Sequence, residues 1–252
     1  SETGGAGVVA NVMTDPVDGD RGHFTAAQVV ERLDRTSRYR PPTSLICLEQ
    51  SHNFAGGTVW PLDRWDGVCA LAAERGIAVH VDGARLLNAT IASGVPAERW
   101  SADADTVWID FSKGLGAPMG ACLAATEEMA DQVWLWKHRL GGAMRQSGLM
   151  AAAAIHALEH HVDRLEDDHT RATRLAKALS EMGATVVDPD TNMVFFDPRP
   201  CGVDSADTVV LLAELEVRVS QIGDRVRAVT HLDVSDADID LAISACAEVL
   251  NP

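Results

Sequence analysis

The sequence predicts an α/β protein, with a large domain built on a mostly parallel sheet and a smaller C-terminal α/β domain. Two observations support this fold class. Short apolar runs alternate with helical patterns at roughly 30-residue spacing, which is typical of βαβ units. The chain of 252 residues is 46% apolar and 23% charged, so it has enough apolar side chains for an ordinary core.

Three apolar runs in the first half are predicted to be parallel strands, at Leu45 to Glu49, Ile77 to Asp82 and Thr106 to Phe111. Polar or glycine-rich residues follow each run at once. In a parallel α/β sheet such residues lie at the carboxyl ends of the strands, where ligands bind. Residues 62–75 carry apolar side chains at helical spacing, and Gly76 is placed to end this crossover helix in a left-handed conformation.

The second half begins with a long helical pattern over residues 147–183, broken near Val162. The elements predicted after it are a strand ending at Val187, a strand over 192–196, a helix from Ser205, a strand near Val217, a strand over 225–229, and a last helix capped by Ser235. We therefore expect a large domain over residues 1–150 and a small domain over residues 151–252.

The charge balance argues against two classes of partner. The chain has 21 basic and 37 acidic residues, a net charge of −16, and it therefore repels nucleic-acid phosphates and anionic lipid surfaces. No apolar run approaches the roughly 20 residues that span a bilayer, and residues 1–5 have no feature of a signal peptide. We predict a cytoplasmic protein without nucleic-acid or membrane partners.

The cysteine and histidine patterns favour neither disulfides nor a metal. The cysteines are odd in number, scattered and set among apolar neighbours, which predicts buried, reduced thiols; they are Cys47, Cys69, Cys122, Cys201 and Cys246. His156 and His160 lie four residues apart on a predicted helix, but no H-E-x-x-H pattern is present. We interpret them as part of a solvated helix face and expect no metal site.

Lys113 is the first candidate for chemistry. It follows an apolar strand and enters a loop with two glycines, Gly114 and Gly116. Desolvation at a buried strand end would favour the neutral amine, which is the form that bonds to an aldehyde. Taken alone, the motif also fits an ordinary surface lysine beside a glycine turn.

Asp82 and Arg85 form the second candidate group, in the segment His80-Val81-Asp82-Gly83-Ala84-Arg85. A carboxylate at a strand end can pair with the nitrogen of a pyridine ring and keep that nitrogen protonated. The alternative is that Asp82 caps the next helix and pairs with Arg85. Asp82 and Lys113 stand one βαβ step apart, so both can face a single ligand.

His52 is the third candidate, in the segment Glu49-Gln50-Ser51-His52-Asn53 that follows a strand. An imidazole can act as a base near neutral pH. A single loop histidine, however, is more often only solvated.

Together these segments resemble the successive motifs of the L-threonine aldolases, in order and in spacing. The segments are Leu48-Glu49-Gln50-Ser51-His52-Asn53, His80-Val81-Asp82-Gly83-Ala84-Arg85, Phe111-Ser112-Lys113-Gly114-Leu115-Gly116-Ala117-Pro118, Gly141-Gly142-Ala143-Met144-Arg145-Gln146-Ser147-Gly148 and Arg227-Ala228-Val229-Thr230-His231. The resemblance covers essentially the whole chain. It implies the aspartate-aminotransferase-like fold, which is fold type I of the pyridoxal-phosphate enzymes, in both the large and the small domain.

The resemblance also implies the reaction and the roles of the residues. Lys113 would bond covalently to pyridoxal 5'-phosphate, Asp82 would hold the pyridine nitrogen, and Arg85 would bind near the ring oxygen or the substrate carboxylate. Arg227 would clamp the α-carboxylate of the amino acid. His52 would contact the β-hydroxyl group and help to remove its proton. The reaction would be a retro-aldol cleavage of threonine, allo-threonine or a related β-hydroxy-α-amino acid into glycine and an aldehyde.

The resemblance further implies a homodimer or homotetramer. Arg145 and Gln146 would reach the phosphate side or the site of a neighbouring subunit, or serve in subunit contact alone.

Two alternatives stay open: another lyase or a racemase of the same fold type, and a truncated, non-catalytic homologue. Members of the family begin earlier than this sequence, with a phosphate-binding turn and a histidine that stacks on the cofactor ring.

Overall fold

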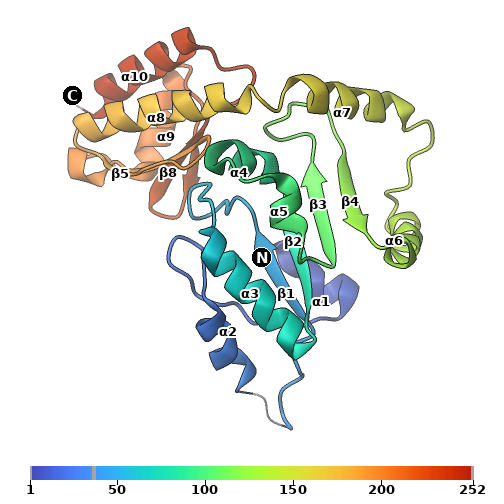
Figure 1. The fold of residues 1–252 in the computed structure, drawn as a ribbon. Coiled ribbons are helices and arrows are strands. Elements are labelled where there is room, and N and C mark those ends of the chain that lie inside the picture. The colour runs from blue at the N-terminus through green and yellow to red at the C-terminus, as the bar shows by residue number, and fades with distance from the viewer. Residues whose placement is uncertain (1, 36–37, 251–252) are drawn as a thin grey trace.

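The first of two four-stranded sheets has the strand order β1-β2-β3-β4 (Figure 1). Its strands are β1 (Leu45–Glu49), β2 (Ala78–Gly83), β3 (Thr106–Asp110) and β4 (Ala121–Ala125). The first three run parallel and β4 is antiparallel, so the prediction of a mostly parallel sheet is confirmed. The computed structural model describes residues 2–35 and 38–250; Ser1, at the start of the predicted large domain, lies outside them.

Helices cover one face of this sheet. They are α2 (Ala26–Leu33), α3 (Leu62–Arg75), α4 (Leu86–Ser93) and α5 (Ala97–Ser101). Ile46, Leu48 and Val81 point to this side and pack with the buried rings of Trp65 and Trp100. As predicted, α3 ends at Gly76, which has φ 63°. Since side chains alternate along a strand, the opposite face presents the polar residues of the strand ends.

The second sheet has the order β5-β6-β8-β7 and is antiparallel throughout. Its strands are β5 (Thr185–Val187), β6 (Met193–Asp197), β7 (Ser220–Ile222) and β8 (Arg225–Val229), and its helices are α8 (Leu165–Glu181), α9 (Ser205–Glu214) and α10 (Asp236–Leu250). The strand predicted near Val217 is displaced to Ser220–Ile222. Val217 is unavailable to the sheet because its N–H group bonds to the carbonyl of Leu212 and closes α9.

A helical bridge joins the two sheets (Figure 1). It consists of α7 (Gly148–His160) and α8, and it breaks near Val162 as predicted. Ala154 and Ala157 of α7 pack against Phe111 and Leu115, which flank the loop of Lys113. Before the bridge, α6 (Glu127–Arg139) has no buried residue. The short elements that remain are η1 (Glu2–Gly4), α1 (Gly5–Ala10) and η2 (Arg199–Cys201).

All five cysteines are free thiols, but the expectation that all are buried was wrong. Burial raises the pKa of Cys69 and of Cys246 to about 11. Cys47 and Cys122 are exposed. Cys47 alternates with buried neighbours on β1 and so falls on the sheet face that the helices leave open.

None of the helices in the described residues is both long and apolar enough to cross a bilayer. Within the same residues, no three His, Cys, Asp or Glu side chains gather as a metal site.

Candidate active site

A cavity of about 430 Å³ opens at the carboxyl ends of β1 and β2. Its walls include Cys47, Glu49, His52, Trp60 and Asp82. Glu49 and Asp82 are register partners on neighbouring strands, so the parallel pairing brings both carboxylates to one edge of the sheet. This is the edge that the sequence predicts for a ligand.

Asp82 and Arg85 stand at the turn between β2 and α4. A carboxylate oxygen of Asp82 accepts the N–H group of Ala84 at 3.0 Å, which fixes the carboxylate in this turn. Burial lowers the pKa of Arg85; Glu49, Asp82 and Asp110 act in the opposite direction, and the charge of Arg227 adds to the lowering. The guanidinium of Arg85 is therefore close to three carboxylates and to a second guanidinium.

Lys113 lies beside Asp110 at the end of β3. Its Nζ atom donates to Oδ2 of Asp110 at 2.5 Å and lies 5.1 Å from the centre of the Trp108 ring. The side chain of Lys113 is 35% exposed. With this exposure and with a carboxylate three residues earlier in contact, Lys113 is not the desolvated lysine that the sequence predicts.

His52 forms a pair with Glu49 at the cavity wall. The Nδ1 atom of His52 accepts the N–H group of Ala55 at 3.3 Å, so in the neutral ring the proton sits on Nε2. Nε2 lies 3.8 Å from a carboxylate oxygen of Glu49. Gly22 packs against the ring from the other side, and a Cβ atom there would lie 2.5 Å from it. His52 is held in place on both sides.

His23 packs behind the same wall, where its ring lies 5.0 Å from the ring of Trp60. It is buried, and within residues 2–35 and 38–250 its Nε2 atom has no hydrogen-bond partner. Burial lowers the pKa of His23 to about 4, so the ring is neutral at pH 7.

Arg227 reaches the site from β8 of the second sheet. One of its terminal nitrogens donates to Oδ1 of Asn53 at 3.1 Å, across 174 positions of sequence. Its Nε atom is buried and has no hydrogen-bond partner among the residues that the structure describes. An unsatisfied buried donor on a cation is costly, and an anion that accepted it would remove that cost.

The loop that carries Asn53 also contacts the segment that precedes β6 of the second sheet. Gly57, at φ 70°, lies so close to Thr191 that a Cβ atom would overlap its hydroxyl oxygen. That hydroxyl donates to the carbonyl of Gly57 at 2.8 Å. Asp190 accepts the N–H group of Val59 at 3.0 Å. These contacts set where Arg227 stands relative to β1 and β2.

The structure gathers most of the predicted residues and leaves two outside. Lys113 is linked to Asp110, His52 to Glu49, and Arg227 to Asn53. Arg145 and Gln146 are exposed in the segment between α6 and α7, and no contact within the described residues joins them to this group.

Three polar residues of the site were not assigned a role from the sequence: Glu49, Asn53 and Asp110. Glu49 and Asn53 flank His52 in the quoted motif, and Asp110 ends a predicted strand. Position at a strand end is the signal that could have indicated all three.

Comparisons with known proteins show the family of the chain. A family described as "Beta-eliminating lyase" matches residues 1–199. The low specificity L-threonine aldolase of Escherichia coli is 35% identical over 235 residues, which are 93% of this chain and 69% of that protein.

Two solved structures share the fold. The Leishmania major threonine aldolase matches with a TM-score of 0.75 at 14% identity, over 95% of this chain and 70% of that one. The N-succinyldiaminopimelate aminotransferase of Mycobacterium tuberculosis matches with a TM-score of 0.68 at 20% identity, over 93% and 64%. The expected aminotransferase-like fold is confirmed. With a family match over residues 1–199 and a relative of this identity and coverage, the chain belongs to the beta-eliminating lyase family.

Proposed function

We propose that this chain is a pyridoxal-phosphate-dependent lyase that cleaves threonine, allo-threonine or a related β-hydroxy-α-amino acid into glycine and an aldehyde. The observation that carries the proposal is the convergence of Asp82, Arg85, Arg227 and the Asp110–Lys113 pair at one edge of a parallel sheet. The relatives named as L-threonine aldolases support the choice of substrate.

The residues present fit the cofactor by their chemistry. Lys113 offers a primary amine for an aldehyde, and Asp82 offers a carboxylate for the pyridine nitrogen. The cavity beside Asp82 has room for a ring and a small amino acid. When bound, the cofactor supplies an electron sink for the carbanion that a broken Cα–Cβ bond leaves behind.

Arg227 would bind the α-carboxylate of the substrate. Its unsatisfied Nε atom and its terminal nitrogens form the planar fork that matches a carboxylate. Asn53 holds one end of this fork, so the guanidinium is oriented before the substrate arrives. Arg85 adds a second positive charge nearby and would favour the same anion.

The pair of Glu49 and His52 would take the proton of the β-hydroxyl group. Because Nδ1 of His52 accepts an N–H group, the neutral ring offers a proton at Nε2 and not a lone pair. Glu49 is the group that can accept a proton on this side. We propose that His52 orients the hydroxyl group and that Glu49 accepts the hydroxyl proton through a water molecule.

The finer properties of the protein are proposals of the same kind. The five free thiols support a reducing, cytoplasmic location. Exposed apolar side chains on α6, such as Trp134 and Trp136, support a homodimer or homotetramer, which light scattering would test. Arg145 and Gln146 would then act in subunit contacts or in a neighbour's site. Residues 1–150 and 151–252 would form the two domains.

The test is a visible spectrum of the purified full-length protein with pyridoxal phosphate, together with an assay for aldehyde release from threonine. We expect an absorption band that depends on Lys113, and a loss of aldehyde release of at least 1,000-fold in Lys113→Ala, since the covalent attachment is removed. Lys177→Ala, an exposed lysine on α8, is the matched control.

Two other results would each indicate a different function. A band without aldehyde release would favour another lyase or a racemase of this fold. A parent protein without a band would be a non-catalytic homologue.

A further inference from the structure

The Nζ atom of Lys113 has two neighbours that favour a positive charge. On one side it donates to Oδ2 of Asp110 at 2.5 Å, and on another it lies 5.1 Å from the centre of the Trp108 ring. A carboxylate and an aromatic face both attract a cation, and neither binds a neutral amine comparably. The Asp110 side chain is only 12% exposed, so water screens the pair less than on an open surface.

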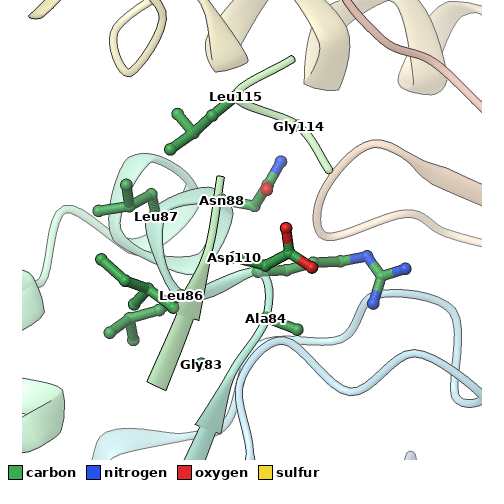
Figure 2. Close-up of a pocket in the computed structure, with 10 residues that line it drawn as sticks. Gly83, Ala84, Leu86, Leu87, Asn88, Asp110, Gly114 and Leu115 are labelled. Carbon is green, nitrogen blue, oxygen red and sulfur yellow. The ribbon is translucent and has the colours of Figure 1, made fainter. Parts of the chain in front are cut away.

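Asp110 is itself fixed for this contact. Its Oδ1 atom accepts the N–H group of Ser112 at 2.6 Å and the Ser112 hydroxyl at 2.5 Å, which leaves Oδ2 for Lys113. Burial raises the pKa of Asp110, but the hydrogen bonds from Lys113 and Ser112 outweigh it and hold the pKa below its ordinary value. Figure 2 shows Asp110 at the end of β3, beside Asn88 of α4 and Gly114.

The other charges near Asp110 come from the neighbouring elements. Arg85, at the start of α4, is close enough to interact with Asp110 and with Asp82 on β2. β4, which pairs with β3 on the other side, carries no charged residue. Arg85 lowers the negative potential at Asp110 without replacing Lys113 as its hydrogen-bond donor.

We propose that Asp110 is a positioning residue that holds Lys113 as an ammonium in the cofactor-free chain and thereby guards it against free aldehydes. The inference rests on the proposed function, in which this lysine must bond to the cofactor and an aldehyde is also a product. Only the neutral amine attacks an aldehyde or an acylating reagent. An anchored ammonium therefore reacts slowly with any aldehyde that has no binding site of its own.

The lysine content makes a direct test feasible. The chain has three lysines, at positions 113, 137 and 177, so every labelled lysine can be assigned by mass spectrometry. The cofactor-free full-length protein is treated with a trace of acetic anhydride, and the labelling ratio of Lys113 to Lys177 is measured at about pH 8 and about pH 12. Near pH 12 lysine side chains are largely neutral, because their ordinary pKa is about 10.4.

We expect Asp110→Asn to raise this ratio about fivefold near pH 8, the size of a modest ion pair, and to leave it unchanged near pH 12. Asp110→Glu should retain most of the parent's protection. Asp238→Asn is the matched control, because Asp238 accepts the N–H and hydroxyl groups of Ser235 in the same way, at the start of α10. Its ratio should equal that of the parent.

Two results would overturn the inference: an unchanged ratio in Asp110→Asn near pH 8, or an equal rise at both pH values, which would indicate altered access and not altered charge. If the variant does not fold, the parent alone decides. Its ratio must rise by about fivefold from pH 8 to pH 12, and a constant ratio contradicts the proposal. If the effect of Asp110 is observed but no visible band forms with pyridoxal phosphate, the inference about Asp110 stands and the proposed function is contradicted.

Discussion

The two sheets differ in how their faces are covered. In the second sheet β6, one of the two inner strands, is buried on both sides, with Met193, Val194 and Phe195 at 0% exposure. In the first sheet helices cover one face, while the other carries Glu49, Asp82 and the half-buried ring of Trp108. Each sheet packs against a hydrophobic core of its own, and the first sheet also holds most of the polar site. The polar residues of the candidate site lie on the face of the first sheet that its helices do not cover.

The largest expected effect contrasts the two sheets in stability. Phe195→Ala removes a fully buried ring and should lower the free energy of unfolding by about 4 kcal/mol. Trp108→Ala removes a larger ring that is only partly buried, and we expect a smaller loss because part of its surface stays in water on folding. Urea unfolding followed by circular dichroism would measure both. Equal losses would contradict the contrast.

The next effect concerns the buried His23 beside the first sheet. Its folded pKa of about 4 lies below the ordinary value of about 6.5. The stability that depends on a neutral ring is therefore present above pH 6.5 and is lost as the pH falls toward 4. Between about pH 7.5 and pH 4.5, the parent should lose about 2.5 kcal/mol more than His23→Phe. Parallel acid-induced losses in both proteins would show that His23 does not titrate as a buried group.

The smallest effect concerns Arg227, the arginine of the second sheet that we propose as the ligand of the substrate carboxylate. Arg227→Lys keeps the charge but loses the planar fork, and we expect KM for threonine to rise about 10-fold to 30-fold. Arg225→Lys is the control on the same strand, since Arg225 donates to the carbonyl of Phe54 and stacks on Phe195. Steady-state kinetics would compare them. Similar changes in KM for both variants would contradict the proposal that Arg227 binds the substrate carboxylate.

Local patterns in the sequence predicted the elements that depend on local chemistry. The helix over residues 62–75 follows from apolar spacing and Gly76, and β1 and β3 from short apolar runs. β4 has no such signal, because Ala121–Ala125 is alanine-rich and shows no alternation. It is a strand because its backbone pairs with β3. Nothing local to the segment could have predicted this.

The site divides in the same way. Residues at strand ends, such as Asp82 and Lys113, could be found because their position follows from the strand. The contact between Arg227 and Asn53 joins residues 174 positions apart, and only the packing of the two sheets brings them together. The Asp110–Lys113 ion pair is local, yet the direction of both side chains depends on the turn that Ser112 fixes.

The close approach of Gly57 to Thr191 has a consequence for engineering. Loop 50–60 follows β1 of the first sheet, but it packs tightly against the segment around Thr191. Gly57 has no room there for a Cβ atom. The loop and the segment around Thr191 therefore form one joint made from both halves of the chain. A chimera that imports the second half from a relative must import loop 50–60 with it, or Arg227 will arrive at the site in the wrong place.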